Sequence, residues 1–285
     1  MSDWQRDANH AHRRAARSFQ CHVVGQQAVE PAEREVVAEQ PLRIIVNGQS
    51  VATLMQTPGA EIELATGWLL SEGLIGSRNQ ITAMSFQFEG SPSAAGVVRV
   101  RLTEELSQAA KRYQATFSSC SLCGLEKIET LAEGLPPFAK PAARLGVEDI
   151  FRLRDAMEVA QPMFRRTGGT HAAALAELPV EPAAQRLVVR EDIGRHNALD
   201  KAIGAAAAMA IAPQRSLLIL SGRLSVEMVA KAARAGISDL AGVSAPSALG
   251  IELARKLNMF LAGFLRGQTL TVYSGLPAMD DAPGQ

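Results

Sequence analysis

Two of the three cysteines, Cys120 and Cys123, form a C-x-x-C pair within the segment 117–129. This spacing occurs in zinc half-sites, dithiol redox proteins and sulfur carriers, and two buried, inert thiols are the structural alternative. A structural zinc site needs four ligands, but the sequence contains no second C-x-x-C and no H-x-x-x-H. A thioredoxin-like pair belongs at an early strand-to-helix junction, whereas this pair follows a β-rich region. Zinc binding and a thioredoxin-like role are therefore the weaker interpretations.

The surroundings of the pair favour an exposed, reactive thiol. Ser118 and Ser119 make the segment polar, and Gly124 follows the second cysteine. A helix that begins near Leu125 would lower the pKa of a thiol at its N-terminus and populate the thiolate, which is the reactive form. A thiolate on an exposed loop could accept a sulfane sulfur as a persulfide and move it to an acceptor. The spacing alone does not separate such a carrier from a dithiol redox protein.

A second set of candidate residues lies in three loops, each of which follows a predicted strand and precedes a predicted helix: 190–197, 221–225 and 244–247. Loops at the carboxyl ends of strands line the ligand crevice in α/β sheets, and the free N–H groups at helix N-termini favour anions. Arg195 and Arg223 add guanidinium donors that suit phosphate. The residues alone therefore predict an anion or nucleotide site in the C-terminal half.

Small and polar residues in these loops support the same site. Gly194 and Gly222 allow a ligand to approach the backbone closely, because glycine has no side chain. His196 is the better functional candidate of the two histidines within the folded region. The structural alternative is that the loop serines only cap helices, and Ser225 and Ser247 are expected as N-caps in either case. The sequence contains no Walker A or G-x-G-x-x-G motif, so neither device holds the ligand.

Hydrophobic periodicity predicts the elements that position these loops. Two apolar runs around the turn Asn47-Gly48 indicate a β-hairpin over 41–55. Three strand–loop–helix units in series indicate an α/β layered sheet. Two expected helices span 61–74 and 147–161. Three more are expected: one begins near residue 197, one ends at residue 236 and one ends near residue 257. The expected strands span 81–88, 97–102, 171–178, 186–190, 216–220 and 240–243, and a last hairpin spans 260–273.

Composition excludes several classes of protein. The 285-residue chain has 29 basic and 29 acidic residues, so bulk electrostatic binding to nucleic acid or to an anionic membrane is not expected. No apolar run is long enough to cross a bilayer, which argues against membrane insertion. Three cysteines are too few for a disulfide framework and fit a reducing compartment. We therefore expect a cytoplasmic globular protein.

Several motifs occur together along the chain. They are Pro41-Leu followed by Asn47-Gly48, Cys120-x-x-Cys123-Gly124, Thr167-Gly-Gly-Thr-His171, Asp192-Ile-Gly-Arg-His-Asn-Ala-Leu-Asp-Lys201, Ser221-Gly-Arg-Leu-Ser225 and Gly263-Phe-Leu-Arg-Gly267. This combination resembles the FdhD family, whose members are sulfur carrier proteins required for formate dehydrogenase activity. The similarity runs from about residue 41 to residue 273, and the Asp-Ile-Gly-Arg-His-Asn run is its most specific part.

The resemblance implies transfer of sulfur from a cysteine desulfurase to a molybdenum (or tungsten) cofactor that carries two pyranopterin guanine dinucleotides. Cys120 would carry the persulfide, Cys123 would be its companion, and molybdenum bis(molybdopterin guanine dinucleotide) would be bound as the substrate. Formate dehydrogenase would receive the cofactor, and a homodimer is expected because family members commonly act as dimers. No resident metal site is expected. The expected cofactor-binding residues are Arg195, His196, Asn197, Ser221, Gly222, Arg223, Phe264, Leu265, Arg266, Gly267, Gln268 and Thr269.

The resemblance also implies a cytidine-deaminase-like α/β layered sheet with an additional smaller β-containing N-terminal region. The Pro/Gly-rich stretch 134–141 is typical of a linker between two such parts. We expect a mobile tail over 1–20, an N-terminal β-rich region with the C-x-x-C loop over 21–140, an α/β cofactor-binding domain over 141–276 and a second mobile tail over 277–285.

Two other functions stay open from the sequence. A non-catalytic cofactor-binding chaperone for formate dehydrogenase maturation would need neither cysteine for turnover. A dithiol redox protein would form a Cys120–Cys123 disulfide with a defined potential and would not depend on a nucleotide. A zinc deaminase does not fit, because that chemistry needs H-x-E and a later P-C-x-x-C. In this chain Ala173 stands two residues after His171, and Ser119 precedes Cys120.

Overall fold

The structure is a computed structural model of the chain. It describes residues 15–26, 28–90, 95–106, 134–139, 146–178 and 186–275. The cysteine pair and the expected C-terminal tail over 277–285 lie outside the described residues. Among the described helices, none combines the length and the apolar character that a membrane span requires.

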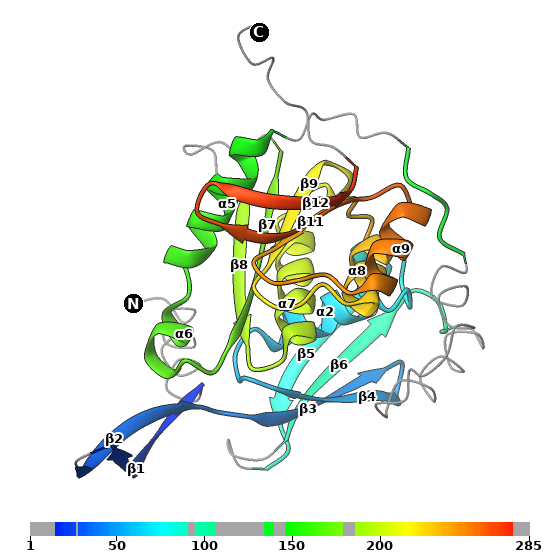
Figure 1. Cartoon of the computed structure of the whole chain (residues 1–285). Coiled ribbons are helices and arrows are strands. Elements are labelled where there is room, and N and C mark those ends of the chain that lie inside the picture. The colour runs from blue at the N-terminus through cyan, green and yellow to red at the C-terminus, as the bar shows by residue number, and fades with distance from the viewer. Residues whose placement is uncertain are drawn as a thin grey trace, which may run out of the picture.

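A six-stranded mixed sheet forms the centre of the C-terminal half (Figure 1). Its strands are β7 (His171–Glu177), β8 (Leu187–Asp192), β9 (Ser216–Leu220), β10 (Asp239–Gly242), β11 (Phe260–Arg266) and β12 (Thr269–Ser274), in the spatial order β12-β11-β10-β9-β7-β8. β9, β10 and β11 are parallel, and β7 pairs antiparallel with both β8 and β9, so β8 runs in the same direction as β9. The carboxyl ends of β8, β9, β10 and β11 therefore meet at one edge of the sheet.

Helices cover both faces of this sheet. One face carries α5 (Val147–Val159), and the other carries α7 (Arg195–Ala208), α8 (Val226–Arg234) and α9 (Ala248–Lys256). In the central strand β7, Ala172 and Ala174 pack on the α5 side, whereas Ala173 and Leu175 pack on the side of the three helices. Side chains alternate along a strand, so a strand that is covered on both faces must be apolar throughout. The small alanines let the helices approach the sheet closely.

A second, four-stranded sheet lies beyond the helices. It consists of β3 (Gln40–Val46), β4 (Gln49–Gln56), β5 (Ile81–Phe88) and β6 (Gly96–Leu102) in the order β4-β3-β6-β5. Helix α2 (Glu61–Ser71) lies between this sheet and α7 (Figure 1). A Cβ atom at Gly67 would lie 1.7 Å from the carbonyl oxygen of Asp200, and one at Gly204 would lie 1.9 Å from the carbonyl oxygen of Glu63. The two helices therefore cross with their backbones in direct contact.

Most of the predicted secondary structure is confirmed. The β3–β4 hairpin turns at Asn47 and Gly48, whose φ angles of 47° and 84° are both positive, as a type I′ turn requires. Helix α7 begins at Arg195, two residues before the expected start, because the Asp192 carboxylate accepts the backbone N–H of Gly194 and shapes the preceding turn. The short helices are η1 (Arg78–Gln80), α6 (Pro162–Thr167) and η2 (Pro213–Arg215).

An antiparallel ribbon of two strands, β1 (Ala16–Val24) and β2 (Val29–Val37), precedes the four-stranded sheet. The expected mobile tail over 1–20 is therefore wrong for residues 16–20, which form the first half of β1. Most of the ribbon is exposed, so no buried face imposes a strong apolar alternation on its sequence. The stretch 134–139 is also not a free linker, because the Phe138 N–H donates to the Leu257 carbonyl at 2.9 Å and its ring packs on the core.

The contact between α2 and α7 predicts that Gly67→Ala destabilises the protein. Helix propensity alone would favour alanine by about 1 kcal/mol, but here the added methyl group meets backbone that cannot move aside. We expect the free energy of unfolding in urea to fall by ~3 kcal/mol or more. The matched control is the reverse exchange, Ala156→Gly in α5, which should cost only ~1 kcal/mol. A Gly67→Ala variant as stable as the wild type would contradict this helix crossing.

A buried carboxylate lies at the opposite edge of the six-stranded sheet. Asp239 begins β10 with a relative exposure of 1%, and its Oδ2 atom has no hydrogen-bond partner among the described residues. Burial raises the pKa of Asp239 from 3.8 to about 6, although a hydrogen bond with Ser238 opposes the shift. A carboxyl whose pKa is raised by folding stabilises the native state only where it is protonated. The free energy of unfolding should therefore rise as the pH falls from about 6 towards 4.

Replacement of this carboxylate by a neutral isostere tests the pH dependence. Asp239→Asn should raise the free energy of unfolding by ~2 kcal/mol at pH 8, where the wild-type carboxylate is ionised and buried. At pH 4 the difference between variant and wild type should shrink, because the wild-type carboxyl is then protonated. Denaturant titrations at both pH values measure the two differences. A constant difference at the two pH values would show that charge burial is not its cause.

Candidate functional site

The candidate site is organised by Asp192, the last residue of β8, which is fully buried. Its Oδ2 atom accepts the backbone N–H of Thr57 at 3.0 Å and forms an ion pair with Lys201 Nζ at 2.7 Å. Its Oδ1 atom accepts the N–H of Gly194 at 2.9 Å and the side-chain amide of Asn197 at 3.1 Å. The contacts with Gly194 and Asn197 shape the loop that follows β8. The contacts with Thr57 and Lys201 attach this loop to the segment after β4 and to α7.

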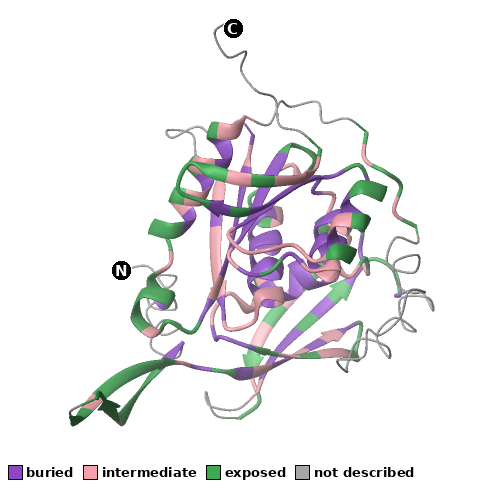
Figure 2. Cartoon of the chain, in the orientation of Figure 1, coloured by how far each residue is buried: buried purple, intermediate pink, exposed green. Residues whose placement is uncertain are grey.

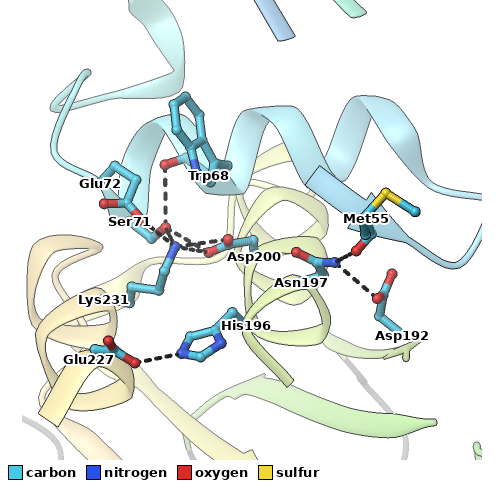
Figure 3. Close-up of polar contacts among 10 residues, drawn as sticks. All are labelled: Met55, Trp68, Ser71, Glu72, Asp192, His196, Asn197, Asp200, Glu227 and Lys231. Atoms are coloured by element: carbon cyan, nitrogen blue, oxygen red, sulfur yellow. Dashed lines mark hydrogen bonds and ion pairs between the residues drawn. The ribbon is translucent and has the colours of Figure 1, made fainter. Parts of the chain in front are cut away.

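The partners of Asp192 attach the N-terminal half to the start of α7. Lys201 also donates to the carbonyl of Thr57 at 2.6 Å. Asn197 donates to the carbonyl of Met55 at 2.7 Å (Figure 3). The N–H of Ile193 donates to Thr57 Oγ1 at 3.0 Å. Asn197, which was predicted to bind the cofactor, thus uses its amide nitrogen to hold the end of β4. Its place in a ligand site stays a prediction.

A second buried charge cluster joins α2, α7 and α8 (Figure 3). Lys231 Nζ lies 2.9 Å from Asp200 Oδ2 and 2.7 Å from Glu72 Oε1, and Ser71 donates to Asp200 Oδ1 at 2.6 Å. Burial raises the pKa of Asp200, although Lys231 and Ser71 act against the shift. Burial alone would lower the pKa of Lys231, but the charges of Asp200 and Glu72 outweigh it and raise the pKa. The lysine is therefore a fixed cation between two acidic side chains.

His196 and Glu227 extend this cluster towards the loops (Figure 3). The His196 Nε2 atom lies 3.1 Å from Glu227 Oε2, and both side chains are half-buried. The hydrogen bond from His196 lowers the pKa of Glu227, although burial opposes the shift. Both residues line a pocket of about 220 Å³, together with Asp200, Lys231 and Trp68. We call this hollow the α2–α7–α8 pocket.

Arg195 adjoins His196 and lies over the glycine loop that follows β9. A Cβ atom at Gly222 would lie 3.2 Å from Arg195 Cβ and 3.5 Å from His171 Nδ1, so glycine lets both side chains lie close to this backbone. The Arg195 Nε atom is buried and has no hydrogen-bond partner in the described part of the chain. Burial and the charges of Arg195 and His196 lower the pKa of His171, against the effect of Asp192. His171 is therefore neutral at neutral pH.

A larger groove of about 690 Å³ opens at the carboxyl edge of the sheet, on the side of α5. We call it the β-edge groove. Its lining comes from α5, from the segment before β7, from the loops after β9 and β10, and from the β11–β12 turn: Arg154, Met157, Glu158, Gln161, Phe164, Gly168, Gly169, Thr170, His171, Ser221, Val243, Leu265, Arg266 and Gly267. Arg154 donates to the carbonyl of Gly267 at 2.9 Å and so fixes the turn.

The predicted ligand residues divide between these two hollows. Ser221, Leu265, Arg266 and Gly267 line the β-edge groove, whereas His196 and Asn197 line the α2–α7–α8 pocket. Arg195 and Gly222 line neither hollow, but Arg195 precedes His196 of the pocket in the chain, and Gly222 follows Ser221 of the groove. The remaining predicted residues, Arg223, Phe264, Gln268 and Thr269, are exposed near these loops and line neither hollow. Cys120 and Cys123 lie outside the described residues.

Phe264 has an unusual backbone for an aromatic residue. Its φ angle is +53°, and its side chain is 41% exposed. Left-handed backbone is costly for a bulky side chain, so such residues mark strained and often functional positions. The N–H of Phe264 donates to the Ser244 carbonyl at 3.2 Å, and the β11–β12 pairing is irregular between Gly263 and Arg266. The β10 loop therefore holds the strand in the conformation that presents Phe264 to solvent.

The two serines expected as N-caps behave differently. Ser247 caps α9, because its Oγ atom accepts the N–H of Gly250 at 3.1 Å. Ser225 occupies the N-cap position of α8, but its Oγ atom makes no capping bond and has no partner among the residues described. The prediction is thus confirmed for Ser247 and wrong for the side chain of Ser225. Ser225 lines neither of the two hollows.

Among the residues of these hollows that sequence reasoning missed are Arg154, Glu227 and Lys231. All lie inside helices, where the only sequence signal is a periodicity that does not reveal which polar side chain points to a cavity. His171 was ranked below His196, yet both lie beside Arg195. In the described part of the chain, no group of three or more His, Cys, Asp or Glu side chains is placed to bind a metal ion. The expectation of no resident metal stays a prediction.

The central ion pair predicts a large effect of Lys201→Met. Removal of the cation leaves Asp192 buried without its countercharge, which typically costs ~3–5 kcal/mol. The free energy of unfolding in urea should fall by about this amount. The control is Lys256→Met in the exposed last turn of α9, where the change should stay within about 0.5 kcal/mol. Equal stability of the two variants would contradict the structural role assigned to the pair.

The chain matches the FdhD/NarQ family over residues 37–279. It is 39% identical over 264 residues to the sulfur carrier protein FdhD of Streptomyces avermitilis, covering 87% of this chain and 90% of that protein. The FdhD of Mycobacterium tuberculosis is 39% identical over 277 residues, covering 93% and 96%. The chain also resembles a crystal structure of a proposed formate dehydrogenase accessory protein from Desulfotalea psychrophila, with a TM-score of 0.71 and 22% sequence identity. The superposition covers 92% of this chain and 97% of that protein, so the two share a fold. The chain therefore belongs to the FdhD/NarQ family.

Proposed function

We propose that this protein is a sulfurtransferase that carries a persulfide sulfur from a cysteine desulfurase to molybdenum bis(molybdopterin guanine dinucleotide) and so activates formate dehydrogenase. The name of its relatives, sulfur carrier protein, supports a role in sulfur transfer. The observation that carries the proposal is the meeting of the predicted loops at one edge of the sheet. There the loop after β9 borders a groove of about 690 Å³ that carries the side chains of Arg154 and Arg266, and the loop after β8 borders the α2–α7–α8 pocket.

The groove and its surroundings suit an anionic, partly apolar ligand. Arg266 is exposed at the rim, and the unpartnered Nε atom of Arg195 lies beside the loop that carries Ser221. Guanidinium groups bind phosphate through two parallel hydrogen bonds, and the N-terminus of α7 adds a favourable dipole. Phe164, whose side chain is 48% exposed, supplies apolar contact area for a pterin or guanine ring. We assign the phosphates of the cofactor to the arginine side of the groove.

The proposed chemistry begins on Cys120. Its thiolate attacks the terminal sulfur of the desulfurase persulfide, a new S–S bond forms on Cys120, and the donor cysteine leaves as a thiolate. The number of sulfur atoms and electrons is unchanged in this exchange. Cys123 acts as the companion thiol of the persulfide. The cofactor, whether it holds molybdenum or tungsten, is the substrate that receives the sulfur.

The wider setting of the proposal follows the family resemblance. The partners are a cysteine desulfurase as sulfur donor and formate dehydrogenase as recipient of the cofactor, and the working form is a homodimer. We place the protein in the cytoplasm, because sulfur carried on a thiolate needs a reducing compartment. The cytidine-deaminase-like layering of the mixed α/β fold and the division near residue 140 stay part of this proposal.

A non-catalytic cofactor-binding chaperone and a dithiol redox protein differ from a sulfur carrier in what their cysteines must do. In a reconstituted maturation reaction with desulfurase, cysteine, cofactor and apo formate dehydrogenase, Cys120→Ala should abolish activation. Cys21→Ala, which removes the third cysteine, is the matched control and should retain activation. Full activation by Cys120→Ala would favour a non-catalytic chaperone. A Cys120–Cys123 disulfide of defined potential, with no nucleotide dependence, would favour a dithiol redox protein.

The placement of the phosphates predicts which arginines matter for nucleotide binding. Arg195→Ala and Arg266→Ala should each weaken the binding of guanosine diphosphate about 10-fold or more, because each removes a charge-assisted hydrogen bond. Isothermal titration calorimetry measures the affinities. Arg215→Ala, which alters an exposed arginine at the opposite end of β9, is the control and should bind as the wild type does. Unchanged affinity in both site variants, with folding intact, would overturn the placement.

A further inference from the structure

His171, the first residue of β7, is half-buried and lines the β-edge groove. Side-chain hydrogen bonds hold the chain on both sides of it. Before it, Thr170 Oγ1 donates to Glu191 Oε1 at 2.9 Å. After it, the N–H of Ala172 donates to Ser221 Oγ at 2.9 Å. The backbone that carries the imidazole is therefore attached both to β8 and to the loop after β9, as a side chain that binds a ligand requires.

The His171 imidazole meets two side chains from the start of α7. A Cβ atom at Gly222 would lie 3.5 Å from His171 Nδ1 and 3.2 Å from Arg195 Cβ, so both side chains lie against the same glycine. The charges of Arg195 and His196 both act on His171. Three side chains that can be cationic, from β7 and from the first turn of α7, therefore come together beside the loop after β9.

The charges around His171 keep its imidazole neutral. Burial lowers its pKa, and the charges of Arg195 and His196 lower it further. Asp192 acts in the opposite direction, but its carboxylate is already paired with Lys201 at 2.7 Å. The other charged residues of this region are Arg154, Glu158 and Arg266 in the lining of the groove, Glu191 beside Thr170, and Glu227 beside His196.

An anion would reverse this balance. A phosphate group beside Arg195 brings negative charge near His171 and offsets the positive charges that disfavour the imidazolium. The imidazole can then accept a proton from water, after which both ring nitrogens are N–H donors. A hydrogen bond from an imidazolium to a phosphate oxygen is about twice as strong as a neutral one. Binding of the phosphate and protonation of His171 therefore favour each other.

We propose that His171 is a phosphate-binding residue of the β-edge groove and that it becomes protonated when the phosphate binds. The proposal rests on the proposed function, because it needs the cofactor phosphates at the arginine side of this groove. The proton comes from the solvent, the imidazole becomes an imidazolium, and no bond of the ligand is made or broken. The alternative is a structural histidine that stays neutral in the complex.

The proton moves in a direction that the ligand cannot produce. The second ionisation of a phosphate group lies at about pH 6, and a cationic site favours the ionised form, so the ligand can only release protons. His171 can only take them up, because its pKa is lowered in the free protein and rises in the complex. The affinity contributed by His171 should therefore increase as the pH falls through the pKa of the complex, and level off below the pKa of the free protein.

The first test counts protons in the full-length protein. Isothermal titration calorimetry of guanosine diphosphate at pH 7, in buffers of different ionisation enthalpy, gives the number of protons bound with the ligand. The wild type should take up a fraction of a proton, and His171→Gln should take up none, because glutamine donates hydrogen bonds but does not titrate. The control is His22→Gln on the β1–β2 ribbon, which Figure 2 shows exposed along most of its length. It should behave as the wild type does.

The pH profile separates a phosphate-binding residue from a structural one. At pH 6.5 the wild type should bind guanosine diphosphate about 10-fold more tightly than His171→Gln does. At pH 9 the two affinities should agree within about twofold, because the imidazole is then neutral in the complex as well. A structural role would weaken binding by the same factor at both pH values, and this result would overturn the proposal. Proton uptake that persists in His171→Gln but disappears in His196→Gln would overturn it too.

The experiments distinguish failure of this proposal from failure of the proposed function. Binding of guanosine diphosphate without proton uptake from pH 6.5 to pH 9 overturns the role of His171 and leaves the phosphate placement intact. Absence of binding in the wild type overturns both the role of His171 and the phosphate placement. Sulfur transfer to Cys120 is measured separately by mass spectrometry, and it tests the carrier chemistry whatever the outcome at His171.

Discussion

The ion pair between Asp192 and Lys201 is the contact on which the arrangement of the site depends. Both side chains are almost fully buried, with side-chain exposures of 0% and 2%. Buried charges are tolerated only when they are paired and their remaining hydrogen-bonding capacity is used. Here the backbone of Thr57 both donates to Asp192 and accepts from Lys201, so the segment after β4 completes the pair. The four-stranded sheet and the loop after β8 are thereby fixed to each other.

This attachment brings the α2–α7–α8 pocket and the carboxyl edge of the six-stranded sheet together near the start of α7. The close crossing of α2 over α7 brings Ser71 and Glu72 to Asp200 and Lys231, which form the floor of the α2–α7–α8 pocket. The carboxyl edge of the six-stranded sheet forms the β-edge groove. Arg195 lies against Gly222, which follows Ser221 of the groove, and it precedes His196, which lines the pocket. A single helix start therefore connects the two parts of the candidate site.

Local signals predicted most elements, because turns and periodicity depend on neighbouring residues. Asn47-Gly48 indicated the hairpin, and the three strand–loop–helix units indicated the edge where the loops meet. Contacts between distant segments were not predictable in this way. Nothing near Asn197 shows that its amide would hold Met55, and helical periodicity does not show that Glu227 faces a pocket. The β1–β2 ribbon escaped detection because it buries neither face within its own chain.

The central claim is that sulfur travels on Cys120, and mass spectrometry without reductant tests it most directly. The purified protein is incubated with a cysteine desulfurase and cysteine, and then analysed intact and as peptides. The account predicts one or more added sulfur atoms on the peptide that contains Cys120, and none in the Cys120→Ala variant. Unmodified thiols despite an active desulfurase, or a Cys120–Cys123 disulfide without added sulfur, would contradict it.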